Sequence, residues 1–425
     1  MGISLGLVGL GAFGTQFAKL FKAHPSVDRI ALCDCEAEKV DKFLHDPFMA
    51  DKVSEKDCYV TLDEICRVDL DALVIITQPW LHAPQCIQAM EAGKHVYSAV
   101  PLISVPDDEE ILEWCGKLIE TVKRTGKQYM LGETTIYRPQ TMFCRRKAAE
   151  GAFGEYVYAE GEYIHDVDGG INGWSNLREV RKHRRTGVVG SQYAALMEKY
   201  HKRGVKGNPM AYPTHSVSGP IHVMQTRAVK VSAYGTPNTN DDPFFDNNDF
   251  SNVTAFFKLA NGASLRIAEH REIGATSFDR DESEIFRIFG KTGSFSRDVW
   301  QTNQRTVAGT AKPIMEDLPN PATPQWPWAG FKRMTPDEMR DPLPPEVQQA
   351  FKPVCNPNAN PRDDFQPTGH GGSHPYLVHE FVSSVLENRE PAIPIAEAAH
   401  YMAMGVAAHR SAQRDGEIVN VPTFD

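Results

Sequence analysis

A glycine-rich turn between an apolar strand and an amphipathic helix constrains this chain more than any other feature. Ile3 to Val8 run into the segment Gly9-Leu-Gly11-Ala-Phe-Gly14, and a helix with Phe17 and Phe21 on one face follows. In this G-x-G-x-x-G pattern the first glycine allows a tight turn, the second lets the backbone approach a pyrophosphate, and the third lets helix and strand pack closely. Free N–H groups at the helix N-terminus favour an anion there. The pattern predicts a dinucleotide site; the alternative is a glycine turn in an unrelated α/β protein.

An acidic residue at the end of the next strand indicates which dinucleotide binds. The apolar stretch Ile30 to Cys33 ends at Asp34, 20 residues after Gly14. A carboxylate there hydrogen-bonds the ribose hydroxyls of NAD and repels the 2′-phosphate of NADP, and no arginine follows it closely. The predicted cofactor is therefore NAD.

Composition and charge favour a globular cytoplasmic enzyme. A chain of 425 residues with 41% hydrophobic and 24% charged residues indicates two domains. The net charge of −10 argues against a nucleic-acid partner. No apolar run reaches the length of a membrane span, and the first strand leaves no room for a signal peptide. The eight cysteines are scattered, and nothing near Cys33 and Cys35 completes a zinc site, so we expect reduced thiols and no metal.

Strands and helices alternate up to residue 132, which predicts a Rossmann domain with a doubly wound parallel sheet over residues 1–132. Ligands of such sheets bind beyond the carboxyl ends of the strands. The segments Gly9–Gly14, Thr77–His82, Ser98–Pro101 and Gly132–Arg138 are expected at that edge. The candidate cofactor-binding residues are Gly9, Gly11, Ala12, Phe13, Gly14, Asp34, Thr77, Gln78, Pro79, His82, Ala99, Val100, Pro101 and Glu133.

Beyond residue 132 the pattern changes to strands without alternating helices. Residues 133–425 are predicted to form an α+β domain for substrate binding and oligomerisation, with an open, mainly antiparallel sheet. Asn261-Gly262 marks a hairpin turn in it. A Pro-rich excursion is expected at 298–370, because 13 of the 29 prolines lie between Pro313 and Pro367, a density that forbids regular helix. It is either a lid or subunit-contact arm, or a flexible loop. Two C-terminal helices follow.

At this point the sequence resembles the glucose–fructose oxidoreductase and inositol dehydrogenase family (Gfo/Idh/MocA). The likeness rests on the N-terminal motifs, on Leu81-His-Ala-Pro84 and Gly93-Lys-His-Val96, and on the C-terminal helix Pro394–Arg414. It implies a Rossmann domain, an open-sheet substrate domain, and hydride transfer between nicotinamide and a ring hydroxyl of a sugar or cyclitol.

Two positions depart from the family pattern. The catalytic lysine of Glu-Lys-Pro is replaced here by Val100, in Ala99-Val100-Pro101. The aspartate that stands four residues before the catalytic histidine is replaced by Ala211. Neither side chain takes up a proton, so either the protein is catalytically silent or other groups do the work.

Three further motifs resemble one branch of the family, the NAD-dependent glycoside hydrolases typified by α-N-acetylgalactosaminidase. They are Tyr163-Ile-His165-Asp166, Tyr212-Pro-Thr-His215 and Gly369-His370-Gly-Gly372. The resemblance implies a retained NAD that oxidises the sugar at C3, which acidifies the C2 proton. Elimination of the aglycone, addition of water and return of the hydride follow.

The candidate catalytic residues are His215, Tyr212, Tyr163 and His165. Removal of hydride from a secondary alcohol needs a base on the hydroxyl proton, which histidine supplies and tyrosine relays. Strand alternation places 163 and 165 on one face. The alternative for His215 is a buried, hydrogen-bonded histidine without a role in catalysis.

The candidate substrate-binding residues are Asp166, Trp174, Tyr137 and His370. Asp166 is alternatively a strand-end cap, Trp174 a loop anchor, and His370 part of a simple turn. The basic run Arg178 to Arg185 is either a solvated face or a site for an anionic group of the substrate.

These observations together predict an NAD-dependent oxidoreductase that acts at a ring hydroxyl, C3, of a sugar or glycoside. The alternatives are a redox-neutral glycosidase with retained NAD and a catalytically silent NAD- or sugar-binding protein. The open sheet predicts a homo-oligomer, because an open sheet face needs cover.

Overall fold

The computed structural model describes residues 2–168, 178, 187–239, 242, 244–274, 285–305, 311–313, 333–358, 360 and 362–424. The chain forms two compact units. Unit 1 contains residues 1–138, 342–403 and 423–425, and unit 2 contains residues 139–341 and 404–422. The chain therefore leaves unit 1 after Arg138 and returns to it at Pro342.

Unit 1 is built on a six-stranded parallel sheet with the order β3-β2-β1-β4-β5-β6. Because both faces of such a sheet are covered by helices, its strands are short apolar runs, and β4 is buried along its whole length. The predicted doubly wound sheet is confirmed. The strands are β1 (Ile3–Val8), β2 (Val27–Cys33), β3 (Cys58–Tyr59), β4 (Ala72–Ile75), β5 (His95–Ser98) and β6 (Tyr129–Leu131).

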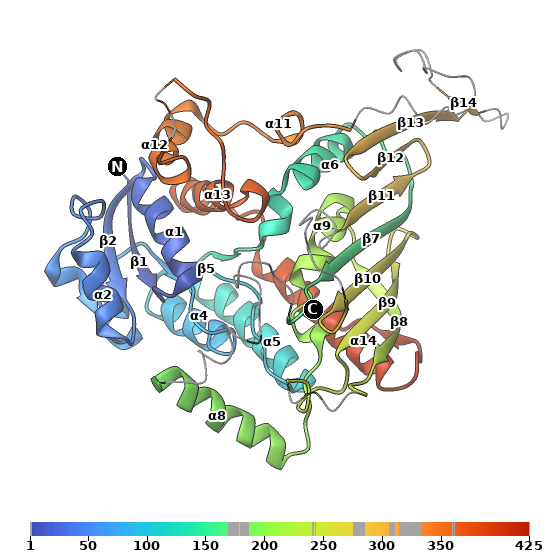
Figure 1. Cartoon of the computed structure of the whole chain (residues 1–425), viewed down its shortest axis with the longest axis horizontal. Helices are drawn as coiled ribbons and strands as arrows, with labels where there is room; N and C mark the ends of the chain where they lie inside the picture. Colours follow the sequence, from blue (N-terminus) through green and yellow to red (C-terminus); the bar gives the residue numbers. More distant parts are fainter. Residues whose placement is uncertain are drawn as a thin grey trace. The chain divides into compact units, whose positions relative to one another are not determined.

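Two groups of helices pack in unit 1. α1 (Ala12–Ala23) lies against α12 (Pro345–Cys355) and α13 (His374–Glu387), as Figure 1 shows. α4 (His82–Glu91) packs against α3 (Leu62–Cys66) and α5 (Asp108–Thr125). The first group joins the two ends of the sequence, since Phe21 contacts Phe381 edge to face. α2 (Ala37–Leu44) and the short helices η1 (Glu55–Asp57) and η2 (Thr134–Tyr137) complete this part.

The expectation that proline density forbids helix in the C-terminal excursion is wrong for both α11 (Pro336–Met339) and α12. Pro345 opens α12 at a position whose N–H needs no partner, and Pro344 is its N-cap. Pro353 lies in the last turn, and Val347 and Phe351 are buried. The prolines thus start and end a helix that apolar packing stabilises. Residues 314–332 lie outside the described residues.

Unit 2 is built on a nine-stranded mixed sheet with the order β14-β13-β12-β11-β7-β10-β9-β8-β15. Only β7 and β10 pair in parallel among its described strands, so the mainly antiparallel sheet is confirmed. Gly262, at φ +90°, forms the predicted turn between β9 and β10. The strands are β7 (Tyr156–Ile164), β8 (Ala228–Thr236), β9 (Asn252–Leu259), β10 (Ser264–His270), β11 (Phe286–Gly290), β12 (Gly293–Ser296), β13 (Val299–Arg305), β14 (Ala311–Pro313) and β15 (Val419–Asn420).

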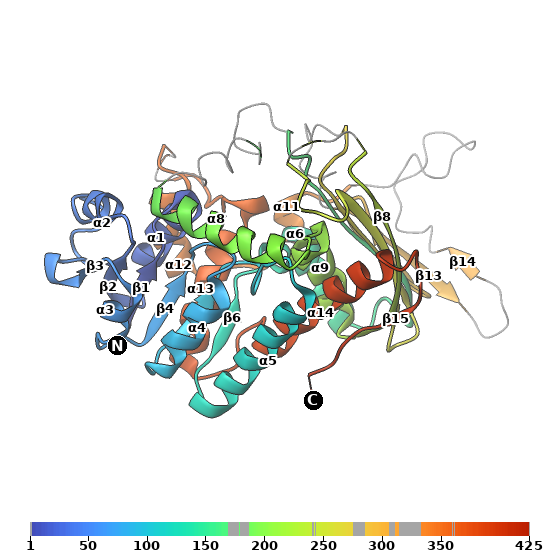
Figure 2. The same ribbon diagram turned by 90° about the horizontal axis from the view of Figure 1, so that it is seen from below.

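One face of this sheet is covered by α9 (Thr214–Met224) and α6 (Pro139–Ala149), seen in Figure 2. α9 approaches β7 closely because residue 161 is glycine: a Cβ there would overlap the Ser216 carbonyl oxygen. On the other face Phe256 and Tyr234 are 52% and 62% exposed. The unit also contains α8 (Gly187–Lys202), η3 (Pro209–Ala211), α11 (Pro336–Met339) and the end of α14 (Ile395–Ala412). None of the described helices has the length and apolar character needed to cross a bilayer.

Candidate active site

The glycine turn has the local geometry that its pattern predicts. Gly9 adopts φ +93°, and a Cβ there would overlap the Ile76 carbonyl oxygen. A Cβ on Gly14 would in turn overlap the Gly9 carbonyl oxygen. At Gly11, the N-cap of α1, no described atom lies within 4 Å of the Cβ position. The structure therefore leaves open space at the position where a pyrophosphate would approach the helix N-terminus.

Asp34 is fixed beside this turn by backbone donors. Its carboxylate accepts hydrogen bonds from the Leu10 N–H at 2.7 Å and from the Glu36 N–H at 2.9 Å. Lys39 lies 4.0 Å from Asp34 and 2.8 Å from Glu36. The open space at Gly11 and the placed carboxylate fit the pyrophosphate and ribose of NAD.

The other candidate cofactor residues follow neighbouring strands. Thr77, Gln78 and Pro79 follow β4, and Ala99, Val100 and Pro101 follow β5. His82 joins the two loops, because its Nδ1 lies 2.7 Å from the Pro101 carbonyl and its Nε2 lies 3.3 Å from the Thr77 carbonyl. Glu133, after β6, is buried and accepts the Thr135 N–H at 2.9 Å. Both residues hold the loops at the carboxyl edge of the sheet in place.

His370 lies at the glycine turn of unit 1. It adopts φ +42°, and its Nδ1 lies 2.9 Å from Nε2 of His374. The ring of Phe13 meets both imidazoles edge to face, at 5.7 and 5.6 Å. Burial lowers the pKa of His374 to about 3, so this histidine is neutral near neutral pH. Tyr137 stacks on Tyr376, with 6.1 Å between ring centroids.

The four candidate catalytic side chains lie together in unit 2. The Tyr163 hydroxyl, on β7, lies 2.7 Å from Nδ1 of His165. The ring centroid of Tyr163 lies 4.8 Å from that of His215 and 6.5 Å from that of Tyr212. The ring centroids of Tyr212, just before α9, and of His215, in its first turn, are 5.4 Å apart. We call Tyr163, His165, Tyr212 and His215 the tyrosine–histidine cluster.

Two charged residues next to the cluster are absent from the sequence-based prediction. Glu269 is fully buried on β10, and burial raises its pKa to about 7, although Arg271 and Ser216 act in the opposite direction. Arg271 pairs with Glu269 at 2.6 Å, and its guanidinium lies 4.4 Å from the Tyr163 ring centroid. The sequence did contain a signal for Glu269. It stands two residues after Ile267 and four after Leu265, so strand alternation puts it on the same buried face. A carboxylate on that face is costly without partners.

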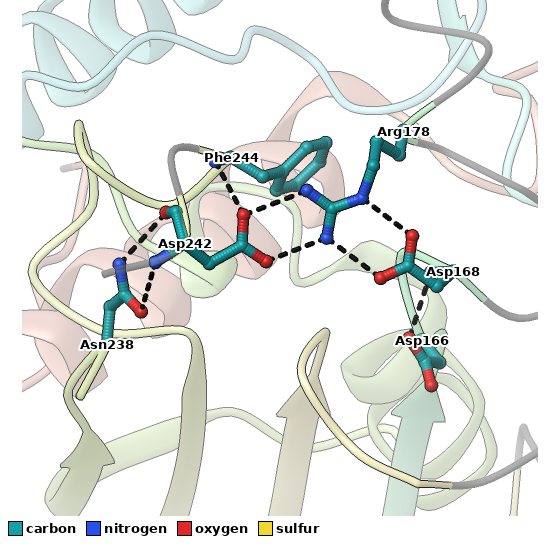
Figure 3. A network of polar contacts seen from close by, with 6 residues as sticks. All are labelled: Asp166, Asp168, Arg178, Asn238, Asp242 and Phe244. Atoms are coloured by element: carbon teal, nitrogen blue, oxygen red, sulfur yellow. Dashed lines mark hydrogen bonds and ion pairs between the residues drawn. The ribbon is translucent and has the colours of Figure 1, made fainter. Parts of the chain in front are cut away.

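Asp166 belongs to a polar network at the end of β7, drawn in Figure 3. Its carboxylate accepts the Asp168 N–H at 2.9 Å, which is the geometry of a strand-end cap. The Arg178 guanidinium binds Asp168 and Asp242 with two hydrogen bonds each, at 2.6–2.8 Å. Arg178 therefore binds two carboxylates of the protein itself, which argues against a role for this residue in binding an anionic group of a substrate. Trp174 and the rest of the basic run lie outside the described residues.

Within the described part of the chain, only Asp34, Cys35 and Glu36 bring three potential metal ligands within 4.8 Å of one another. Cys35 and Glu36 are exposed, and the carboxylates of Asp34 and Glu36 already have Leu10 and Lys39 as partners. All eight cysteines are unpaired.

An α/β unit with a dinucleotide turn and a second unit with an open mixed sheet define the architecture of a nicotinamide-dependent oxidoreductase. The resemblance stated from the sequence is confirmed: residues 3–133 match the model of the Gfo/Idh/MocA oxidoreductase family, described as an NAD-binding Rossmann fold. The cofactor of this unit is therefore NAD.

Curated relatives extend the likeness. The chain is 23% identical over 435 residues to glycosyl hydrolase family 109 protein 1 of Bacteroides fragilis, covering 99% of this chain and 85% of that protein. It is 31% identical to a glycosyl hydrolase family 109 protein of Porphyromonas gingivalis, covering 52% of this chain and 48% of that protein. A third match, to a protein of the same name from Shewanella pealeana, spans 43% of that relative.

Solved structures share the fold. Myo-inositol 2-dehydrogenase from Lactobacillus plantarum aligns with a TM-score of 0.63 at 14% identity, covering 99% of this chain and all of that one. At this level of identity the likeness establishes the fold class and nothing about the substrate.

Proposed function

We propose that this protein transfers hydride between NAD and a hydroxyl-bearing ring carbon, C3, of a sugar or glycoside. The observation that carries the proposal is the tyrosine–histidine cluster in a chain whose other unit binds NAD. The family's usual lysine and aspartate are absent at Val100 and Ala211, both of which are buried. The cluster supplies the acid and base groups that these two positions lack.

Each member of the cluster has a role in the proposal. His215 takes the proton from the reacting hydroxyl, since imidazole titrates near neutral pH. The Tyr163 hydroxyl, 2.7 Å from Nδ1 of His165, passes a proton along that hydrogen bond. Tyr212 packs against His215 and limits its rotation. Asp166, which follows β7 two residues after its end, is proposed to contact the sugar.

Unit 1 contributes the cofactor site. In the proposal the residues from Gly9 to Gly14 bind the pyrophosphate of NAD and Asp34 binds its adenosine ribose. His82 fixes the loops after β4 and β5 through its two carbonyl contacts, and these loops shape the nicotinamide side. NAD bound there supplies an acceptor for the hydride of the ring carbon.

A second candidate outcome is redox-neutral cleavage of a glycosidic bond. The names of the curated relatives favour it, as does the replacement of the usual lysine by Val100. In this outcome the C3 ketone acidifies the C2 proton, a base of the cluster removes it, and the C1–O bond breaks. Water then adds, and the sugar recovers its hydrogen at C3.

Heavy water separates the two outcomes. Protein loaded with NAD is incubated with aryl glycosides in heavy water without free NAD. Many turnovers with deuterium at C2 establish glycosidic cleavage. One turnover that stops until NAD is added, with a 3-keto sugar and an intact C–O bond, establishes the dehydrogenase. If a panel of sugars and glycosides gave no NADH absorbance and no product, the proposed hydride transfer would be contradicted.

We also propose a cytoplasmic homo-oligomer. Eight unpaired cysteines favour a reducing compartment. The open face of the unit 2 sheet exposes Phe256 and Tyr234 beside the charged group Arg266, Glu160 and Arg287. Exposed aromatic residues within a polar surround are typical of a protein interface. Light scattering of the wild type and of Tyr234→Glu tests this: the wild type is expected to be oligomeric, and the variant shifted toward monomer.

A further inference from the structure

Glu269 occupies an unusual position for a carboxylate. It lies in the middle of the unit 2 sheet, where the parallel ladder between β10 and β7 sets it opposite Tyr163. Its neighbour in the antiparallel ladder is Val253, which is buried. Glu269 has no exposed surface. An ionised carboxylate at such a place is costly unless charged and hydrogen-bonding partners compensate it.

Glu269 bonds directly to α9 through Ser216 and reaches β7 through Arg271, which directly follows β10. One carboxylate oxygen accepts a short hydrogen bond from the Ser216 hydroxyl, and Ser216 follows His215 directly on α9. The other accepts from the Arg271 guanidinium at 2.6 Å. Arg271 also donates to the Tyr163 carbonyl at 3.0 Å and lies over the Tyr163 ring. One carboxylate thus joins the strand that carries Tyr163 to the helix that carries His215.

We propose that Glu269 is a positioning residue that, through Ser216 and Arg271, fixes the Tyr163 ring against the His215 ring for proton transfer. The inference rests on the proposed function, because it gives a reason for the arrangement of that cluster. Arg271 is the second positioning residue, since it binds the Glu269 carboxylate and the Tyr163 carbonyl at the same time.

The geometry favours this role over mere filling of the core. Proton relays depend strongly on the separation of donor and acceptor, and small displacements cost large factors in rate. Outer partners that orient metal-ligating side chains contribute about 10- to 100-fold in activity, and we expect a factor of the same order for Glu269. The raised pKa of Glu269 places its proton exchange near neutral pH. The groups that face it are Arg271 directly after its own strand, Tyr163 on β7, and His215 and Ser216 on α9.

The test compares two charge-removing variants on the two faces of one sheet. Glu269→Gln removes the buried carboxylate beside the cluster. Glu162→Gln is the matched control: Glu162 is also buried and paired with an arginine, Arg266, but it lies on the other face of β7. Glu269→Asp tests rescue by a shorter carboxylate. For each variant kcat, KM, NAD affinity, the pH–rate profile and the NMR signals of the Tyr163 and His215 rings are measured.

We expect Glu269→Gln to lower kcat by about 10- to 100-fold, with KM and NAD affinity within about threefold of wild type. The pH profile of kcat should lose the contribution of Glu269 and keep that of His215, and both ring signals should shift. Glu269→Asp should recover part of kcat, and Glu162→Gln should leave every readout unchanged. Wild-type kcat, pH profile and ring signals in Glu269→Gln would overturn the proposal.

A second variant and the ring signals test the positioning proposal even if Glu269→Gln does not fold or the wild type shows no turnover. If Glu269→Gln does not fold, Ser216→Ala removes the bond between Glu269 and α9, together with the Ser216 bond to the Pro213 carbonyl. A wild-type kcat with unmoved ring signals in that variant then overturns the proposal. If the wild type acts on no sugar, the proposed function fails by itself. The ring signals still decide the positioning proposal, because they report the arrangement of Tyr163 and His215 without turnover.

Discussion

His215 and Tyr163 meet in space although they stand 52 positions apart in the sequence. Each motif alone is compatible with an ordinary buried histidine or tyrosine. Their rings pack at 4.8 Å between centroids, and this contact brings together two side chains that can exchange protons. Substitutions of single residues such as His215 therefore test the proposed chemistry most directly.

Replacement of His215 by alanine should lower turnover by about 10²- to 10⁴-fold, the usual contribution of a positioned general base. NAD binding should be unchanged, because the glycine turn and Asp34 belong to the other unit. Steady-state kinetics and a fluorescence titration with NADH measure both quantities. His222→Gln on the same helix is the control, and turnover near wild type in His215→Ala would return His215 to a structural role.

Asp34 sets the choice between NAD and NADP. The wild type should bind NAD much more tightly, since the 2′-phosphate of NADP would face a carboxylate. Asp34→Ser should raise the affinity for NADP relative to NAD, because the repelling charge is gone and the cation of Lys39 stays within reach of the site. Calorimetric titration with both cofactors measures the ratio. Tighter binding of NADP by the wild type would contradict the assignment of Asp34 to the ribose.

At the scale of elements, the fit of α9 on β7 depends on a missing side chain. Gly161→Ala would place a methyl group against the Ser216 carbonyl and push away the helix that carries His215. We expect a loss of stability of about 1–3 kcal/mol, the usual cost of overpacking, and a larger loss of activity.

Gly116→Ala is the matched control for this change. Apart from its chain neighbours and the backbone of its own helix, no described atom lies within 4 Å of a Cβ at Gly116, in the middle of α5. The same substitution should there stabilise the protein by about 0.5–1 kcal/mol, because alanine favours helix over glycine. Urea denaturation of both variants measures the difference, and equal stabilities would contradict the packing argument.

The elements also show how far the sequence alone leads. The strands and most helices of unit 1 follow from short apolar runs, from the glycine turn and from end signals such as Gly126 after α5. The sequence did not predict α9. Every residue from Thr214 to Met224 is buried, so the segment lacks the alternation of apolar and polar faces that indicates a helix. Glu269 and Arg271 escaped because a local pattern does not reveal that β10 pairs with β7. The members of the cluster were found through motifs, whereas their mutual contacts required the fold.

At the scale of the molecule, the two units should respond to acid in opposite directions. Burial lowers the pKa values of His24 and His374 in unit 1 to about 3. Both histidines therefore stay neutral in the folded unit while the unfolded chain takes up protons below about pH 6.5. The stability of unit 1 should fall as the pH falls from about 6.5 toward 3. Glu269 in unit 2 keeps its proton up to about pH 7, so its contribution to stability falls as the pH rises from 4.5 to 7.

Hydrogen exchange at pH 7 and pH 5, corrected for intrinsic rates, measures this difference. Exchange through opening should increase at pH 5 in the helices around His24 and His374. It should not increase in β7, β9 and β10, which surround Glu269. His24→Gln should weaken the acid response of unit 1, and an equal response of both units to pH would contradict the assignment of these groups.

The discontinuous make-up of unit 1 bears on how a newly made chain matures on the ribosome. Phe17 and Phe21 pack against His374 and Phe381, and the Leu131 N–H bonds to the Ile393 carbonyl. The first part of unit 1 thus waits for residues 342–403, and residues 139–341 of unit 2 emerge in between. Synthesis normally lets domains fold in order from the N-terminus. Here a nascent chain exposes the unfinished apolar face of α1 until α13 has emerged, so we expect that face to be accessible to chaperones during synthesis.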